Sequence, residues 1–101
     1  MNDAICRISI DPPDSVQFEG EERPVRVGPT VYRALRLMLA RECCEASTLK
    51  AAVWGTRAGD HPETSLRALL GRVNGLLRAH GCRRVLSLDV FRVTWVDDTQ
   101  T

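Results

Sequence analysis

The stretch TSLRALLGRVNGLLRAHGCRR, residues 64–84, decides the fold of this chain. Its apolar residues recur at the spacing of one face of an α-helix; they are Leu66, Leu69, Leu70, Val73, Leu76 and Leu77. The opposite side carries arginines and small residues, and it includes Gly71 and Gly75. Each of these glycines costs a helix about 1 kcal/mol relative to alanine. The spacing predicts an amphipathic helix that starts at Pro62 or Glu63 and stops at Gly81, and it raises the question of what its small-residue side faces.

The sequence before this helix divides into a β-rich part and a helical part. Short runs rich in β-branched residues and separated by polar turns predict three strands and a small antiparallel sheet; they are AICRISI (4–10), VQFEG (16–20) and RPVRVG (23–28). Pro29 is suited to the first position of a helix that continues to about residue 41. A turn around Cys44 follows, Ser47 is a good N-cap for a short second helix that Gly55 ends, and residues 55–62 read as a loop.

The sequence after the long helix predicts a β-hairpin. RVLSL (84–88) and FRVTW (91–95) are the two expected strands, with a turn at Asp89-Val90, and residues 97–101 read as a frayed tail. The chain of 101 residues is expected to form one α+β domain. This domain would consist of a sheet at 4–28, helices at about 29–80 and a terminal hairpin at 84–96.

The charges are unevenly distributed although the net charge is only +1. Residues 23–41 and residues 64–88 each contain five arginines and no acid, whereas residues 1–22 contain six acids and one arginine. Thirteen of the fourteen basic residues are arginine, which is suited to bidentate contact with phosphate or carboxylate. Local fields of this kind decide which partners a surface attracts.

Several function classes find no support in the sequence. His61 and His80 have no nucleophile or carboxylate at a motif spacing, and no glycine-rich phosphate loop is present, so we expect neither an enzyme nor a bound cofactor. The four cysteines do not have the spacing of a zinc site or of a CxxC redox pair, so we expect no metal and reduced thiols. No signal peptide or membrane-spanning run is apparent, which favours a cytoplasmic protein without membrane contact.

The order of these segments resembles the OmpR/PhoB-type winged helix-turn-helix domain, most closely the branch found in SARP-type and bacterial transcriptional activator regulators. The segments that carry the resemblance are VRVGPTVYRALRLMLA (25–40), LKAAVWG (49–55), SLRALLGRVNGLL (65–77) and LSLDVFRVTW (86–95). The resemblance implies a stand-alone transcription regulator whose third helix enters the major groove of double-stranded DNA and whose hairpin, the wing, touches the adjacent backbone. It carries DNA contact over to Arg67 and Arg72 on the helix and to Arg92 in the wing.

The chemistry of the residues adds further expected DNA contacts. Small residues at Gly71 and Gly75 would let the helix backbone approach the DNA closely, and Asn74 could pair with adenine. Basic or polar side chains that could reach bases or flanking phosphates are Arg78 on the same helix, Arg83 and Arg84 after it, and Thr48 and Lys50 near the start of the second helix. One such domain makes few contacts, so we expect a homodimer or a protein partner on adjacent half-sites.

A second interpretation remains open at this stage. The same small-residue side of the helix, with Gly71 and Gly75 at its floor, could accept a helix or a bulky side chain of another protein. The expected turn at Asp89-Val90 favours this alternative, because it lacks the glycine and the basic residue common in the family, and an acid beside phosphate would repel. The two interpretations are therefore a DNA-binding regulator and a protein-binding adaptor that use one surface.

Overall fold

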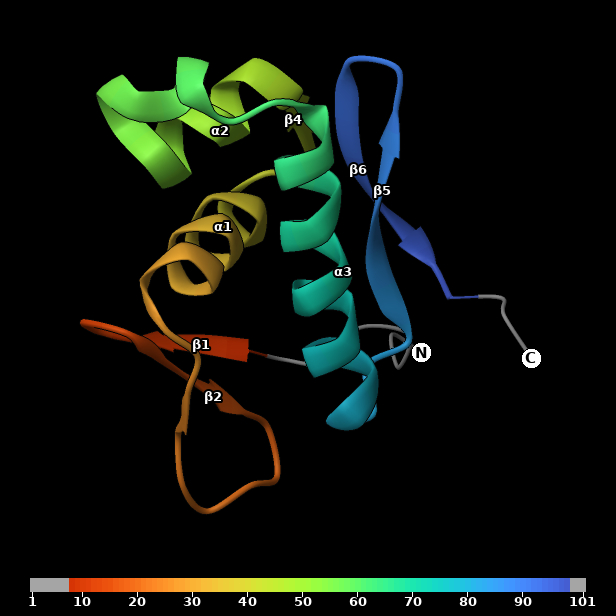
Figure 1. The fold of residues 1–101 in the computed structure, drawn as a ribbon. Coiled ribbons are helices and arrows are strands. Elements are labelled where there is room, and N and C mark those ends of the chain that lie inside the picture. Colours follow the sequence, from red (N-terminus) through yellow and green to blue (C-terminus); the bar gives the residue numbers. More distant parts are fainter. Residues whose placement is uncertain (1–7, 99–101) are drawn as a thin grey trace.

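The computed structural model describes residues 8–98 of the chain. The described part is an α+β fold with three α-helices and two small antiparallel sheets (Figure 1), as expected from the sequence. Its elements, in chain order, are β1 (Ile8–Asp11), β2 (Ser15–Phe18), β3 (Val25–Arg26), α1 (Pro29–Ala40), β4 (Cys43–Glu45), α2 (Ala46–Trp54), the 3-10 helix η1 (Gly55–Asp60), α3 (Glu63–Ala79), β5 (Arg84–Asp89) and β6 (Arg92–Asp97).

The N-terminal sheet has the strand order β1-β2-β3 and packs on the helices through one face. Val16 and Phe18 alternate along β2 with half-buried residues, and both are fully buried in the core. Phe18 also stacks on His80 at the end of α3, with the ring centroids 4.2 Å apart, and the Nδ1 atom of His80 lies 2.6 Å from a carboxylate oxygen of Glu21. These contacts join the N-terminal sheet to the C-terminal end of α3. Residues 4–7 of the first expected strand lie outside the described residues.

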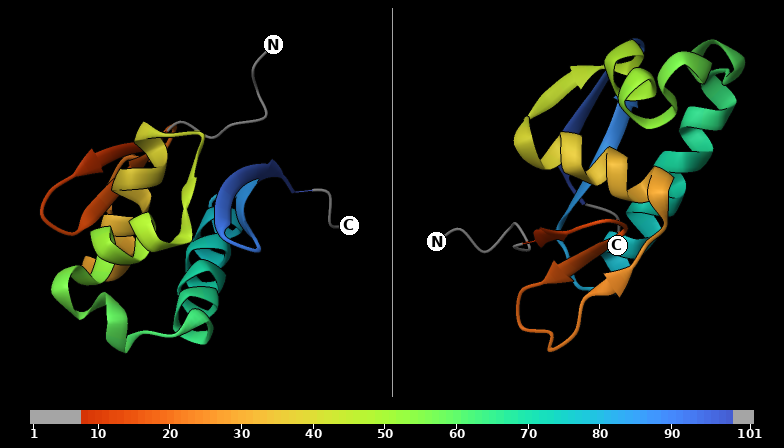
Figure 2. Two further views of the ribbon diagram at one scale, coloured as in Figure 1. Left: turned by 90° about the horizontal axis from the view of Figure 1, so that it is seen from above. Right: turned by 90° about the vertical axis from the view of Figure 1, so that its left-hand side faces the viewer.

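Helix α1 forms the centre of the core. Pro29 occupies its first turn, where a missing backbone N–H is tolerated. Gly28 precedes it with a φ of 83°, a left-handed conformation that favours glycine. Leu35 and Met38 are fully buried and belong to a cluster that includes side chains of all three α-helices. In Figure 2 the helices lie between the N-terminal sheet and the β5–β6 hairpin.

Two segments between α1 and α3 differ from the sequence-based expectation. Residues 43–45, expected to turn, form strand β4, which pairs antiparallel with β6 and gives the second sheet the order β4-β6-β5. The distant hairpin supplies this pairing, so local sequence could not indicate it. Helix α2 begins at Ala46 and is flanked by Glu45, so Ser47 is not its N-cap. The expected loop contains η1, a 3-10 helix of six residues, or about two turns, that follows α2 directly.

Helix α3 is one continuous rod of 17 residues. It begins at Glu63, as predicted, and passes through Gly71 and Gly75 without a break. Its predicted apolar face is buried, apart from the half-buried Leu76, and packs on α1 and β5. In Figure 1 the helix lies between α1 and the β5–β6 hairpin. Gly81 follows it with a φ of 80°, in agreement with its expected role as the C-terminal stop.

The C-terminal hairpin begins at Arg84 as expected, but its turn lies one residue later and its second strand ends later than expected. Strand β5 continues to Asp89 and β6 begins at Arg92, so the turn consists of Val90 and Phe91 and not of Asp89 and Val90. Strand β6 also extends to Asp97, and the N–H group of Asp98 donates to the carbonyl oxygen of Arg83 at 2.7 Å. Residues 97 and 98 are therefore part of the fold and not of a frayed tail, whereas residues 99–101 lie outside the described part.

Candidate partner-binding face of helix α3

The exposed half of α3 has small residues along its centre. Gly71 and Gly75 are both exposed, and a Cβ atom added to either would have no other heavy atom within 4 Å apart from its own helix backbone and chain neighbours. Ala68 and Ala79 are exposed on the same half of the helix. Packing within the described structure therefore does not require glycine at either position. We call this exposed half of the helix, together with the arginines at its borders, the α3 face.

Two arginines on the α3 face are held by carboxylates. The Nε atom of Arg67 lies 2.7 Å from Glu63 one helical turn earlier, and both side chains are more than half exposed. The Nε atom of Arg78 lies 2.9 Å from Asp98, which follows β6. Ion pairs between exposed side chains typically contribute about 0–1 kcal/mol. A phosphate or carboxylate of a partner could therefore replace Glu63 at little cost, whereas Asp98, whose side chain is only 17% exposed, holds Arg78 through two nitrogens.

Two further arginines near this face have side chains without a protein partner. Arg72 lies at the border of the α3 face, and Arg83 follows the helix before β5. Both are exposed, and neither side chain forms a hydrogen bond or ion pair with another residue in the range 8–98. The structure thus brings Arg67, Arg72 and Arg78 onto one helix, beside the two glycines, as the sequence predicted.

The side-chain amide of Asn74 is engaged within the fold. Its Nδ2 atom donates to the carbonyl oxygen of Leu86 on β5, and its Oδ1 atom accepts from the N–H group of the same residue, both at 2.8 Å. Asn74 thus satisfies two backbone groups at the outer edge of β5 that would otherwise lack partners there. A contact between Asn74 and adenine stays a prediction, and it would require the amide to leave Leu86.

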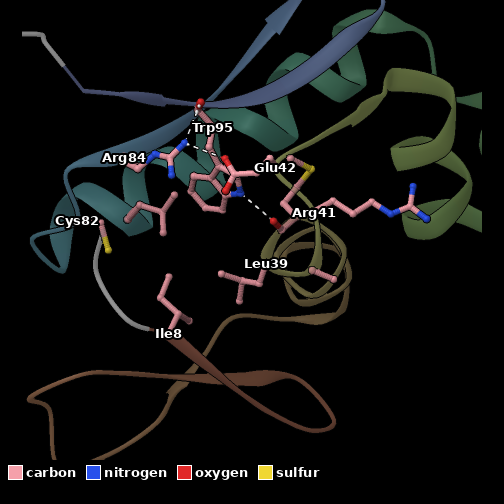
Figure 3. Close-up of a pocket in the computed structure, with 10 residues that line it drawn as sticks. Ile8, Leu39, Arg41, Glu42, Cys82, Arg84 and Trp95 are labelled. Atoms are coloured by element: carbon pink, nitrogen blue, oxygen red, sulfur yellow. Dashed lines mark hydrogen bonds and ion pairs between the residues drawn. The ribbon is translucent and has the colours of Figure 1, made fainter. Parts of the chain in front are cut away.

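Arg84 also points away from the α3 face. Its side chain is only 18% exposed, and its Nη2 atom donates to the carbonyl oxygen of Trp95 at 3.2 Å and lies 3.4 Å from Glu42. Its guanidinium also lies over the Trp95 ring, 6.0 Å from the centroid. Figure 3 shows these side chains beside a hollow of about 220 Å³ that Ile8 and Cys82 also line. Arg84 supports this packing, so the expected phosphate contact, which stays a prediction, would require its side chain to leave Trp95 and Glu42.

The predicted contacts near the start of α2 lie beside the hairpin turn. The N–H group of Ala46, the first residue of α2, donates to the carbonyl oxygen of Phe91 at 2.7 Å. Lys50 is half-buried and lines a hollow together with Glu63 of α3. Thr48 is half-buried in the first turn of α2. The backbone groups at this helix end therefore already contact the hairpin, and Lys50 is the basic side chain nearest to them in the hollow.

The hairpin turn is the feature that sequence reasoning missed. Val90 and Phe91 are exposed at its tip, whereas the wing of the resembled family would have a basic residue there. Arg92 is exposed, but in the strand register it stands opposite Asp89 on β5 and opposite Glu45 on β4. In the sequence, the signal for this exposed apolar turn is the dipeptide Val90-Phe91 between two polar residues. It was overlooked because the expected turn was placed one residue too early.

Comparisons of the chain with protein-family models, with curated proteins and with solved structures find no match. None of the helices within residues 8–98 combines the length and the apolar character needed to cross a membrane.

Proposed function

We propose that the chain is a winged-helix regulator of transcription of the OmpR/PhoB type that binds double-stranded DNA through the α3 face. The observation that carries this proposal is the open space over Gly71 and Gly75 at the centre of an exposed helix. Both glycines weaken the helix, by about 1 kcal/mol each relative to alanine, and neither is required by internal packing. A partner that approaches the helix backbone closely would explain why glycine stands at both positions.

The arrangement of the elements supports this proposal. A short helix, α2, precedes the longer α3, and the β5–β6 hairpin lies beside α3 in the position of a wing. The major groove of DNA is about 12 Å wide and admits one α-helix. Helix α3 has 17 residues, a length of about 25 Å, so it can lie along the groove with its glycine positions toward the base edges.

The charges of the α3 face support a phosphate-binding partner. Arg72 and Arg83 are exposed and have no side-chain partner within residues 8–98, and the exposed pair of Arg67 can exchange its acid for a phosphate. Arg78 is partly exposed beside them and is the fourth candidate, although Asp98 holds it more firmly. If these four arginines neutralise four phosphates, log K should fall with log salt with a slope near −4. Arg92 remains a candidate for backbone contact in the wing.

The first experiment measures binding of a fluorescent pool of random duplex DNA by anisotropy over a salt series. We expect binding that weakens with the predicted slope and that is reduced at least tenfold in the double variant Arg67→Glu, Arg72→Glu. Arg36→Glu is the matched control, because Arg36 is an exposed arginine on α1 outside the α3 face. An equal loss in this control, or a flat salt response, would contradict the proposal.

The second experiment tests the close approach. A Cβ atom added at Gly75 has no other heavy atom within 4 Å apart from its own helix backbone and chain neighbours, and glutamine is a better helix former than glycine. Gly75→Gln should therefore fold. We expect it to lose DNA affinity by at least tenfold. Gly59→Gln in η1, which also has open space around it, is the control and should bind like the wild type. Undiminished binding by Gly75→Gln would mean that α3 does not enter the groove.

A second candidate function is a protein-binding adaptor that uses the same α3 face. The specific observation in its favour is that acids already balance Arg67 and Arg78 and that the amide of Asn74 is engaged within the fold. The centre of the face, between Arg67 and Arg78, is therefore close to neutral and consists of small residues. Absence of duplex binding even at low salt would favour this candidate over the first.

A further inference from the structure

The turn of the β5–β6 hairpin exposes two large apolar side chains next to each other. Phe91 is 77% exposed and Val90 is 66% exposed, the two highest values for large apolar residues in the described part of the chain. Isolated exposed apolar residues are common on protein surfaces, but an adjacent pair at the tip of a hairpin forms a contiguous apolar projection. We call these two residues the apolar tip.

The backbone conformation of the apolar tip is unfavourable for its sequence. Val90 has a φ of 57°, and it is the only residue other than glycine with a positive φ within residues 8–98. The first position of such a two-residue turn is normally glycine, since a β-branched residue is strained there. Valine therefore stands at a position where neither the positive φ nor the exposure to solvent favours it. Strain of this kind points to a function for the residue.

A hollow that could receive the apolar tip lies directly beside it. This hollow of about 180 Å³ is formed by the starts of α2 and α3 and by the hairpin. Val90 and Phe91 of the apolar tip line it themselves, and Ala46, Leu66 and Leu88 complete its apolar lining, so the tip that could enter it is that of another copy. A protein cavity of about 150 Å³ accepts a benzene molecule, so one phenyl ring fits in a hollow of this size. The hydrogen bond from the N–H group of Ala46 to the carbonyl oxygen of Phe91 fixes the position of the tip relative to the hollow.

The charges around the hollow favour a second copy of this chain over DNA. Lys50 and Arg92 stand near Glu63, Asp89 and Glu45, and Arg67 pairs with Glu63, so the surroundings contain both signs in balance. Such surroundings offer a phosphate backbone no excess of positive charge, and a twofold axis can bring an acid of one copy opposite a base of the other. A contact between identical patches also requires that projection and hollow occur on the same surface, as they do here.

We infer that the chain self-associates through this surface, with Phe91 of each copy seated in the hollow of the other. The inference goes beyond the proposed DNA binding and does not depend on it, because the association needs only the protein. A dimer formed in this way would present two α3 helices to a partner with twofold symmetry.

The test is sedimentation velocity of the full chain, without DNA, over a concentration series up to about 1 mM, where a contact with a millimolar dissociation constant is substantially populated. We expect a monomer–dimer equilibrium in the wild type. Phe91→Ser removes the projection, and Ser47→Lys puts a charge into the hollow from an exposed lining residue. Each variant should raise the dissociation constant at least tenfold. Val96→Ser removes an exposed apolar side chain from the far end of β6 and should have no effect.

The variants also distinguish a specific contact from general apolar association. Phe91→Ser and Ser47→Lys should both weaken the dimer, whereas Val96→Ser, which also removes an exposed apolar side chain, should not. An equal loss in Val96→Ser overturns the inference, and so does a wild type that remains monomeric throughout the series. If Phe91→Ser instead lowers DNA affinity in a monomeric protein, the apolar tip belongs to the DNA contact.

Discussion

The side-chain amide of Asn74 on α3 pairs with both backbone groups of Leu86 on β5, at 2.8 Å each. Strand β5 is an edge strand of its sheet, and the outer edge of such a strand carries N–H and C=O groups without strand partners. Asn74 satisfies one donor and one acceptor of this edge, where the helix covers it. The pair therefore joins α3 to the hairpin and fixes how the α3 face is oriented relative to the turn.

We predict that Asn74→Ala lowers the free energy of unfolding by about 1–3 kcal/mol, because it leaves two partly buried backbone groups of Leu86 without partners. Urea denaturation followed by circular dichroism measures this change. Arg72→Ala, which removes an exposed side chain without a partner on the same helix, should change the stability by less than about 0.5 kcal/mol. Equal stabilities of Asn74→Ala and the wild type would show that the two hydrogen bonds contribute nothing.

Gly71→Ala and Gly75→Ala are expected to stabilise the protein, each by about 1 kcal/mol or slightly less. Both glycines are helical, and an added methyl group meets no atom within 4 Å, so alanine gains helix propensity without a steric penalty. Denaturant midpoints measure the gain. A loss of stability at either position would mean that the α3 face is packed in solution, which contradicts the open surface on which the proposed function rests.

Much of the helical architecture could be predicted from local sequence. The apolar periodicity of residues 66–77 predicted α3 and its buried face, and Gly81 and Pro29 predicted a helix end and a helix start. These features depend on contacts within one helix or on one backbone conformation, so a single segment contains the information. The same holds for the position of Arg67, Arg72 and Arg78 on one exposed side.

The errors concern residues whose roles depend on distant partners. Cys44 lies in strand β4 because Val93 on β6 pairs with it, and Arg84 is engaged because Trp95 and Glu42 lie beside it. Neither relationship leaves a periodic signal in the sequence. Asn74 also has the polarity expected of a DNA-contacting residue, and only the position of Leu86 decides that its amide is used internally. Side-chain type alone therefore indicated which groups a residue could bind. It did not indicate whether the side chain points to solvent or into the fold.

Val90→Gly should stabilise the protein, with an expected gain of about 1 kcal/mol. An L-residue in the left-handed region costs about 1–2 kcal/mol, and glycine adopts the φ of 57° without strain, although it loses more entropy on folding. Thermal denaturation of dilute protein measures the effect, since dilution excludes any contribution from association. Val96→Gly is the contrasting variant, because it places glycine inside β6 and should destabilise. A destabilised Val90→Gly would mean that the exposed valine packs within the monomer.

The two adjacent cysteines of β4 are expected to differ in reactivity and in their effect on stability at high pH. Cys43 is exposed, whereas Cys44 is buried with its Sγ atom 3.5 Å from the Sδ atom of Met38. Burial raises the pKa of the Cys44 thiol above its ordinary value of 9.0, and the nearby Arg41 only partly opposes this shift. In a background with Cys6→Ser and Cys82→Ala, which leaves these two cysteines alone, Ellman's reagent should therefore modify Cys43 rapidly and Cys44 only after unfolding.

A raised pKa in the folded state also makes stability fall with pH. Near neutral pH the Cys44 thiol is protonated in both states, so it adds no pH dependence there. Above its ordinary pKa the unfolded chain releases the proton while the folded protein retains it, which favours unfolding. Between about pH 8 and about pH 10 the wild type should consequently lose more stability than Cys44→Ala, whereas Cys43→Ala should follow the wild type. Identical pH profiles of the wild type and Cys44→Ala would contradict the burial of this thiol in solution.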